Sequence, residues 1–380
     1  MKPKRIEFWS STEYSGFLEG LMRELPAHGL ETRQRFQILE VSYRGVKSPL
    51  ERLFLRVRQY LVYPLQLICT LLFERFFRRQ SDVCVVSTNT FYAPLLATFL
   101  HPNVVHLIYD LFPEAMIHSG KWKDGSLKVK CVCWITRKTL WRARMNVFLG
   151  QRLKEHVESQ YGALLNATVI EVGADQTLFG RNGNAEKLKT GVEILYCGNL
   201  GNLHDTETIF SFWKKLTVSL EQKLLNFRWR FNCSGPKQAE LVAVQKLLPS
   251  ELKNRIQIGG GLSQSEWIAA MKTADIALVT MMPGSESVVM PSKAYSAMMA
   301  GQSILAIAPE ESDLVDMIKA VDCGWWIEPG NVDALEKVLI DICANTDEIL
   351  KKGVRAYIYA HECLGQDVLA EKWRKLLDGF

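Results

Sequence analysis

The stretch IALVTMMPGSESVVMPSKAYSAMMAGQSILAIAPEESDLVDMIKAVDCGWWI, residues 276–327, alternates short apolar runs with segments of helical pattern. The runs 276–280 and 303–307 are apolar at nearly every position, which is typical of parallel strands that are covered on both faces. The segments 292–299 and 313–320 follow these runs and have the spacing of helices. This alternation predicts a doubly wound α/β domain.

The same alternation runs through the rest of the chain. Further strands are predicted at 6–10, 83–87, 104–109, 144–150, 167–172, 193–197, 227–233, 256–258 and 324–327, and further helices at 17–27, 205–216, 236–247 and 265–272. One polar, glycine-containing stretch, GRNGNAEKLKTG at 180–191, lacks apolar periodicity, and we interpret it as a linker.

The length of the chain points to two domains. At 380 residues it exceeds the roughly 250–300 residues that a single core usually holds. We therefore expect an α/β protein with two Rossmann-like, doubly wound domains, at 1–180 and 190–365. A C-terminal helix at about 366–380 can pack back onto the first domain.

The composition is that of a folded globular protein. Hydrophobic residues make up 48% and charged residues 23% of the chain, which excludes a disordered, collagen-like or coiled-coil protein. The longest apolar run, Tyr60–Phe73, is interrupted by Pro64 and is too short for a spanning helix. Residues 1–5 are basic, but no apolar signal segment follows them. We expect a cytoplasmic protein.

Potential metal ligands are scattered along the chain. The nine cysteines include no C-x-x-C pair, so we expect free thiols that act as buried small hydrophobes. The seven histidines lack the spacing of metal ligands, and no D-x-D motif is present. We expect no metal ion and no other cofactor.

Positive charge is concentrated in the first half of the chain. Residues 1–180 contain 24 Lys and Arg against 16 Asp and Glu, a net charge of +8, whereas residues 181–380 carry −3. Basic residues gather at 44–79 and 121–144, which indicates an anionic partner. Nucleic acid is not expected, because no nucleic-acid-binding motif accompanies these basic stretches.

A predicted helix at 52–79 combines basic residues with an apolar stripe. The stripe consists of Leu53, Val57, Tyr60, Leu61, Leu65, Ile68, Leu72 and Phe76. Such a helix either lies on an anionic membrane surface or packs its stripe into the core. The sequence alone leaves both interpretations open.

Three loops of the second half follow predicted strands, where ligands of open α/β sheets bind. The first, CGNLGNLHD at 197–205, has two glycines that let backbone amides approach an anion. The second, Cys233–Pro236, suits a flat ring or a ribose. The first loop is equally compatible with an ordinary turn, and for the second loop alone an ordinary helix start is the favoured interpretation.

The third loop, 281–293, ends in Pro291, Ser292 and Lys293 at a predicted helix start. A hydroxyl that caps the helix and an ammonium group would together suit a diphosphate. The alternative is a capped surface helix with a solvated lysine. The apolar residues that follow Lys293 indicate that the helix packs inside the domain.

Segments 290–331, 195–209 (LYCGNLGNLHDTETI) and 265–279 (SEWIAAMKTADIALV) resemble the bacterial glycosyltransferases of family 4. Those enzymes have the GT-B fold, in which two Rossmann-like domains face each other. In the first half, IYDLFPEAM at 108–116 is similar to the D-x-x-P-E segment of members that build surface polysaccharides.

The resemblance implies a nucleotide-sugar site in the second domain. It assigns the diphosphate to the loop with Gly198, Asn199 and Gly201 and to Ser292 and Lys293, and the base to Ser234, Gly235 and the loop Gly261, Leu262 and Ser263. Donor binding also includes Asn202, Met290 and Pro291. The resemblance also implies that Asp110 contacts the reacting sugar or the acceptor hydroxyl. The alternative for Asp110 is a helix-start carboxylate, because Leu111–Glu114 begins a predicted helix.

The sequence departs from the family pattern at two places. Many members carry two glutamates eight residues apart, where this chain has Val288 and Ser296. Glu286 or Ser296 is the candidate to bind the ribose instead. The frequent arginine after the first loop glycine is replaced by Asn199, so Lys293 and helix dipoles, with His204 as a further candidate, are left to meet the phosphate charge.

We expect a retaining, metal-independent glycosyltransferase that uses a UDP-sugar, with UDP-glucose or UDP-N-acetylglucosamine favoured. The acceptor implied is a lipid-linked saccharide of surface polysaccharide biosynthesis, with the enzyme on the inner face of the membrane. A nicotinamide-dependent oxidoreductase does not fit, because no G-x-G-x-x-G motif is present. A GT-B sugar-nucleotide epimerase and a non-catalytic nucleotide-binding or scaffold protein remain as alternatives.

Overall fold

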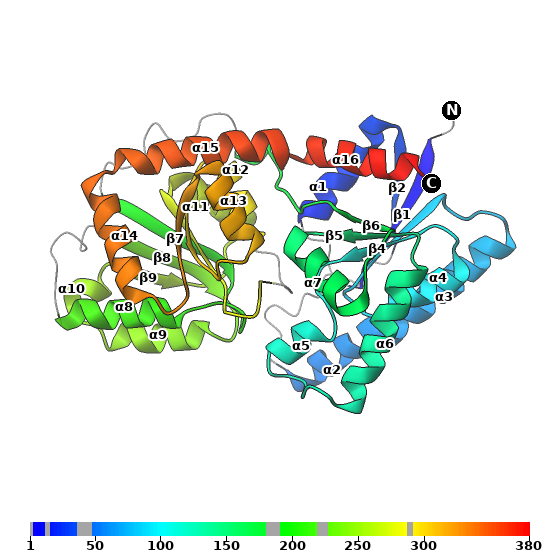
Figure 1. Cartoon of the computed structure of the whole chain (residues 1–380), viewed down its shortest axis with the longest axis horizontal. Coiled ribbons are helices and arrows are strands. Elements are labelled where there is room, and N and C mark those ends of the chain that lie inside the picture. The colour runs from blue at the N-terminus through cyan, green and yellow to red at the C-terminus, as the bar shows by residue number, and fades with distance from the viewer. Residues whose placement is uncertain (1–2, 12–15, 36–47, 180–190, 219–226, 287–291) are drawn as a thin grey trace. The chain divides into compact units, whose positions relative to one another are not determined.

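The computed structural model describes residues 3–11, 16–35, 48–179, 191–218, 227–286 and 292–380. They form two compact units (Figure 1). The first holds the described residues of Met1–Val172 and Gln366–Phe380, and the second those of Gly173–Glu286 and Pro291–Gly365. The division falls shortly before residue 180, and the expected linker, apart from Gly191, lies outside the described residues.

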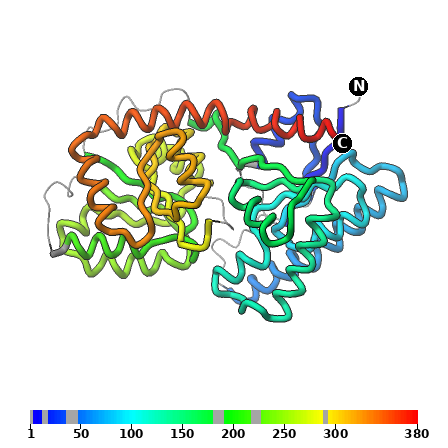
Figure 2. Tube along the Cα trace, viewed as in Figure 1, coloured from blue at the N-terminus to red at the C-terminus, as the bar shows by residue number. Residues whose placement is uncertain are grey.

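The first unit is built on a parallel sheet of six strands, which Figure 2 traces from blue to green. Its order is β2 (Leu30–Arg35), β1 (Lys4–Trp9), β3 (Val83–Ser87), β4 (Val104–Ile108), β5 (Met145–Phe148) and β6 (Ala167–Val169). The five predicted strands are confirmed with slightly different bounds. The sequence did not predict β2, because this edge strand, LETRQR, has no apolar run.

Helices cover both faces of this sheet. They are α1 (Gly16–Glu24), the 3₁₀ turn η1 (Leu25–His28), α2 (Pro49–Val57), α3 (Tyr63–Phe76), α4 (Ala93–Leu100), α5 (Glu114–His118), α6 (Leu127–Arg142) and α7 (Gln151–Tyr161). The helix predicted over 52–79 is three consecutive pieces, since the π-helical η2 (Arg58–Val62) joins α2 to α3. Tyr63, Leu67 and Leu71 pack against the sheet beside Trp9.

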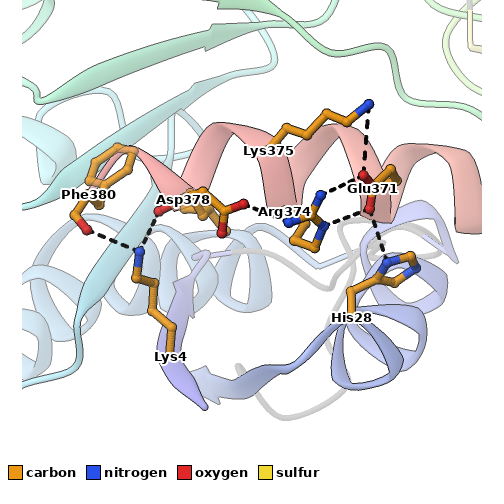
Figure 3. Close-up of polar contacts among 8 residues, drawn as sticks. Lys4, His28, Glu371, Arg374, Lys375, Asp378 and Phe380 are labelled. Atoms are coloured by element: carbon orange, nitrogen blue, oxygen red, sulfur yellow. Dashed lines mark hydrogen bonds and ion pairs between the residues drawn. The ribbon is translucent and has the colours of Figure 1, made fainter. Parts of the chain in front are cut away.

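The last helix, α16 (Gln366–Asp378), belongs to the first unit although it follows the second in sequence. Figure 3 shows how it is held. The Lys4 ammonium donates to the carbonyl oxygens of Leu377 (2.5 Å) and Phe380 (3.1 Å), and Glu371 lies 3.3 Å from the His28 imidazole. α16 also contacts α1 and η1, so the chain terminus completes one face of the sheet.

The second unit has a parallel sheet of six strands. Its order is β12 (Gly324–Ile327), β11 (Ser303–Ile307), β10 (Ile276–Thr280), β7 (Val192–Asn199), β8 (Phe227–Ser234) and β9 (Ile256–Gly259). The strand order reverses between β7 and β10, and such a reversal opens a crevice beyond the carboxyl ends of the strands. All six predicted strands are confirmed, β10, β11 and β12 with the expected bounds.

Eight helices flank this sheet within the described residues. They are α8 (Glu207–Val218), α9 (Gln238–Lys246), α10 (Ser250–Lys253), α11 (Gln264–Thr273), α12 (Lys293–Met299), α13 (Asp313–Val321), α14 (Val332–Ala344) and α15 (Asp347–Cys363), with α16 continuing into the first unit. Trp213, Trp229 and Phe231 lie at the centre of the core, where their rings pack edge to face or tilted. Two Rossmann-like domains are therefore confirmed.

All nine cysteines are free thiols. Cys84, Cys233 and Cys323 are buried, as expected, but Cys69 and Cys131 are exposed. The expectation of buried thiols is wrong for these two because they lie on the outward faces of α3 and α6. No helix among the described residues combines the length and apolar character needed to cross a bilayer.

Candidate nucleotide-sugar site

The carboxyl end of β7 brings Gly198 against Lys293. The φ of Gly198 is +126°, a conformation that side chains rarely adopt. A Cβ built on this glycine would lie 2.8 Å from Cε of Lys293. Glycine at this position therefore lets the lysine side chain lie directly on the backbone of the strand end.

Lys293, the first residue of α12, is a half-buried ammonium without a carboxylate partner. Its Nζ donates to Nε2 of His204 at 3.2 Å and lies 5.4 Å from the ring centre of Tyr196. Neither neighbour carries a negative charge, and Lys293 forms no ion pair with the described residues. Desolvation lowers its pKa to about 8. A positive charge held this way is stabilised by an incoming anion.

His204 orients this lysine. Its Nδ1 lies 2.8 Å from the carbonyl oxygen of Thr280. Because a carbonyl oxygen can only accept, we assign the proton to Nδ1, and Nε2 then accepts from Lys293. Burial, followed by the charges of Lys293 and Lys237, lowers the pKa of His204 to about 4. The imidazole is neutral at pH 7, so the suggestion that His204 supplies positive charge to phosphate is wrong.

The second loop interlocks with the first. The Leu200 amide donates to the Ser234 carbonyl oxygen at 2.6 Å, and the Lys237 amide donates back to the Leu200 carbonyl oxygen at 3.3 Å. Gly235 has φ +122°, and a Cβ there would lie 2.6 Å from Oδ1 of Asn199. The two loops therefore approach each other as closely as their backbones allow.

Lys237 is a second cation at this site, and the sequence analysis missed it. Its Nζ donates to the carbonyl oxygen of His204 at 2.7 Å. Lys237 comes just before α9, two residues after Gly235. Its position in the second loop was a weak signal, but only the folded chain brings it to the His204 loop.

A cavity of about 170 Å³ lies beside Lys293. Ser292 and Ser296 line it together with Cys197 and Trp267. The expectation that the Ser292 hydroxyl caps α12 is wrong, because Ser292 has helical φ and ψ and its side chain makes no capping bond. Ser292 and Ser296 instead line the cavity.

Among the described residues, no side-chain hydrogen bond joins the other predicted donor residues to Lys293. Gly201 forms the turn whose carbonyl accepts from the His204 amide, and Asn202 is exposed beside it. Ser263 follows Leu262 and caps α11 in a capping box with Glu266, so its hydroxyl is already engaged. Glu286 is described, and one of its carboxylate oxygens is buried without a hydrogen bond to the described residues.

Three positions named from the sequence cannot be placed. Met290, Pro291 and Val288 lie outside the described residues. The assignment of Met290 and Pro291 to donor binding stays a prediction.

Asp110 belongs to the first unit, directly beyond β4. Its backbone amide donates to the Thr88 hydroxyl at 3.4 Å, and the Tyr109 amide does so at 3.1 Å. Helix α5 begins only at Glu114 with Pro113 as its N-cap, so the helix-start interpretation of Asp110 is wrong. Its carboxylate forms no hydrogen bond or ion pair with the described residues.

The protein around Asp110 raises the pKa of its carboxyl group by desolvation, to about 6. The residue is nevertheless exposed to solvent, and water screens part of this effect. The raised pKa brings the carboxylate closer to the range of a general base at neutral pH.

Replacing Gly198 with alanine is expected to weaken nucleotide binding and to lower the melting temperature. The new methyl would displace Lys293, and the positive φ would cost about 1–3 kcal/mol of stability. Isothermal titration and thermal unfolding measure the two effects. Gly201→Ala is the matched control, because Gly201 has no positive φ and its Cβ would meet side-chain atoms alone, of Asn199 at 3.3 Å and of His204 at 4.0 Å. Equal effects of both substitutions would contradict this account.

The arrangement suits a ligand with a condensed negative charge and a polar ring system. Lys293 and Lys237 supply cations, two glycine-containing loops supply accessible backbone, and the adjoining cavity supplies two hydroxyls. Within the described ranges, no group of three or more His, Cys, Asp or Glu is placed to hold a metal ion.

Known proteins resemble this chain in sequence and in fold. No family model matches the chain. A curated relative, the probable glycosyltransferase WbjE of Pseudomonas aeruginosa, is 26% identical over 281 residues, which cover 70% of this chain and 67% of that protein.

Solved structures share the fold at low sequence identity. HepE of Anabaena, solved with UDP, superposes with a TM-score of 0.69 at 12% identity, covering 99% of this chain and all (100%) of that chain. WaaG, a glycosyltransferase of lipopolysaccharide biosynthesis, superposes with a TM-score of 0.66 at 13% identity, covering 99% of this chain and 100% of that chain. Sucrose-phosphate synthase of Thermosynechococcus elongatus superposes with a TM-score of 0.68 at 12% identity, covering 99% of this chain and 98% of that chain.

These findings confirm the resemblance that the sequence indicated. The two six-stranded parallel sheets are those of the GT-B fold, which the solved neighbours share. The sequence relative is itself named as a glycosyltransferase. The chain is a glycosyltransferase with the GT-B fold, similar in sequence to the probable glycosyltransferase WbjE.

Proposed function

We propose that this enzyme transfers a sugar from a UDP-sugar to a saccharide acceptor, and that Lys293 binds the diphosphate of the donor. The observation that carries the proposal is the ammonium of Lys293. It is desolvated and oriented by a neutral histidine, and no carboxylate in the described ranges pairs with it. As the glycosidic bond breaks, negative charge grows on the leaving diphosphate. A fixed cation next to it stabilises the transition state.

The choice of nucleotide is supported by the fold neighbours. HepE has been solved with UDP, with UDP and glucose, and with UDP-glucose. We infer that UDP-glucose or UDP-N-acetylglucosamine is the donor here. The Ser234–Gly235 loop and the cavity with Ser292 and Ser296 are the candidates for base and ribose, with Glu286 as a further ribose ligand.

Isothermal titration with UDP, GDP, ADP and NAD tests the donor. We expect UDP to bind most tightly. Tight binding of NAD without binding of UDP would overturn the proposal. Release of sugar from UDP-glucose or UDP-N-acetylglucosamine by the purified protein would separate a transferase from a scaffold, and a product with inverted sugar stereochemistry still attached to UDP would indicate an epimerase.

We further propose metal-independent transfer with retention of the anomeric configuration. Lys293 and Lys237 can offset the diphosphate charge without a divalent ion, and retention rests on the family resemblance alone. Turnover that is unchanged by EDTA, and an α-linked product from an α-linked donor in NMR spectra, are the expected results. Loss of turnover in EDTA that Mg²⁺ or Mn²⁺ restores would contradict the first part.

UDP affinity is expected to fall as the pH rises above about 8. The pKa of Lys293 is lowered to about 8 in the free protein. Its side chain is therefore a charged ammonium below this pH and a neutral amine above it. Bound diphosphate favours the charged form and raises this pKa, so binding above pH 8 takes up a proton. Affinity should drop by up to about tenfold per pH unit.

Isothermal titration from pH 7 to 10, in buffers of different ionisation enthalpy, measures this proton uptake. Lys293→Arg is the control, because arginine stays charged over the whole range and should remove the slope. A slope that persists in this variant would assign the titration to another group.

The acceptor is proposed to be a lipid-linked saccharide, with the protein in the cytoplasm. The support is the D-x-x-P-E segment around Asp110 together with the basic first half of the chain. Transfer assays that compare a polyprenyl-diphosphate saccharide with the same saccharide without lipid test this choice. A preference for the free saccharide would contradict it.

A further inference from the structure

An apolar and basic surface covers the outer side of one helical layer in the first unit. α3 contacts α4, and α4 contacts α6, so the three helices form neighbours in one layer (Figure 1). We define the outer face by its exposed apolar residues, which are Leu61, Leu65, Leu72, Phe73 and Phe76 of η2 and α3, Phe99 of α4, and Trp134 and Trp141 of α6.

The face of α3 that reaches solvent is the one that the sequence marked as apolar. Leu65 is 60% and Phe76 is 81% exposed. The opposite face, with Tyr63, Leu67 and Leu71, is the one that packs against the sheet. Because both faces are apolar, the helix fills the core and still leaves large hydrophobic side chains outside. The core interpretation of the stripe is therefore wrong.

α6 adds a second, independent group of the same kind. Trp134, Arg137, Lys138 and Trp141 follow each other at helical spacing and line one shallow depression of about 470 Å³. Both tryptophans are 58% exposed. Tryptophan beside lysine and arginine is the combination found where proteins meet the headgroup region of a bilayer.

α4 and α6 are joined at this surface. The Arg142 guanidinium lies 4.2 Å from the ring centre of Phe99, and its Nε donates to the Thr98 hydroxyl at 3.2 Å. The Arg142 side chain therefore connects α6 to α4 at this surface.

The charge of the surface indicates what covers it. Segments 49–79 and 127–142 contain eleven Lys and Arg but only two acidic residues, Glu51 and Glu74, and Glu74 is buried beside Arg35. A second copy of the same face would bring like charges together. An anionic surface with an apolar interior satisfies both the basic and the apolar side chains.

We propose that the outer face docks the enzyme onto a bilayer that contains anionic phospholipid. The aromatic and aliphatic side chains enter the headgroup boundary, and the arginines and lysines contact lipid phosphates. This extends the proposed function by naming the surface on which a lipid-linked acceptor would be met. It rests on the first unit alone and does not depend on the assignment of the donor.

Vesicle flotation tests the proposal with the full chain. Vesicles of phosphatidylcholine alone are compared with vesicles that also contain phosphatidylglycerol, at low and high salt. We expect flotation with the anionic vesicles at low salt and release at high salt, because salt screens the attraction. Absence of flotation with anionic vesicles at low salt would overturn the proposal.

Two double variants separate the contributions. Arg137→Gln with Lys138→Gln should lower partitioning about fivefold per charge removed. Trp134→Ser with Trp141→Ser should lower it at both salt concentrations. Lys246→Gln with Leu247→Ser is the matched control, since these neighbours are an exposed basic and an exposed apolar residue of the second unit. Equal flotation of all three variants would overturn the assignment.

Two further measurements keep the outcomes distinct. Circular dichroism and UDP titration report whether each variant is folded and binds donor, so a failed donor proposal is not mistaken for a failed docking surface. Sedimentation velocity reports self-association. A dimer that the outer-face variants lose would assign this face to a second copy of the chain instead of lipid.

Discussion

Replacement of Lys293 by alanine is expected to weaken UDP binding about 10- to 150-fold, because a charge-assisted bond to a partly desolvated phosphate contributes about 1.5–3 kcal/mol. Turnover should fall as well, since the same ammonium faces the leaving group as its charge grows. The prediction rests on the contact of this lysine with neutral His204 and on the finding that no carboxylate of the described residues pairs with it. Nothing else in the surroundings described balances its charge.

Stability distinguishes this role from a structural one. A half-buried ammonium without an anionic partner costs free energy in the unliganded fold. Lys293→Met, which keeps the apolar stem, should therefore leave the melting temperature unchanged or raise it while UDP affinity falls. Lys272→Ala removes an exposed lysine of the same unit and should change neither. Unchanged UDP affinity in Lys293→Ala would show that the lysine does not bind the nucleotide.

The fold could be predicted where burial leaves a simple pattern. β10, β11 and β12 are covered on both faces, so their sequences are continuous apolar runs, and their bounds match the predicted ones. β2 escaped prediction because an edge strand needs no such run. The position of the helix at 52–79 could be predicted, but not which of its faces is buried. Apolar residues occur on both faces, and only packing against the sheet decides which one is buried.

The donor site was predictable in its parts but not in its connections. Glycines after a strand and a lysine at a helix start can be recognised from sequence. The contact between Gly198 and Lys293 joins residues that are far apart along the chain, and the neutrality of His204 depends on its burial and on Thr280. Lys237 carries no motif, and folding alone brings it to the loop that contains His204.

Asp110→Asn is expected to reduce turnover about 100-fold or more, the usual contribution of a positioned acid–base group, and to leave UDP affinity nearly unchanged. Asparagine keeps the size of the side chain but cannot accept a proton. The carboxylate is suited to contact the sugar or the acceptor hydroxyl because it forms no bond with the described residues and caps no helix.

The pH dependence gives this prediction its sharpest test. The pKa of Asp110 is raised from its usual value to about 6, so the carboxylate is ionised above pH 6 and becomes protonated below it. Turnover of the unmodified enzyme should fall as the pH drops through this range, and the remaining turnover of Asp110→Asn should not. Asp124→Asn, an exposed carboxylate of the same unit, is the control. Because ionisation of Asp110 is disfavoured in the fold, Asp110→Asn should be at least as stable at pH 7. Equal losses of turnover and UDP affinity, together with a lower melting temperature, would instead assign Asp110 a structural role.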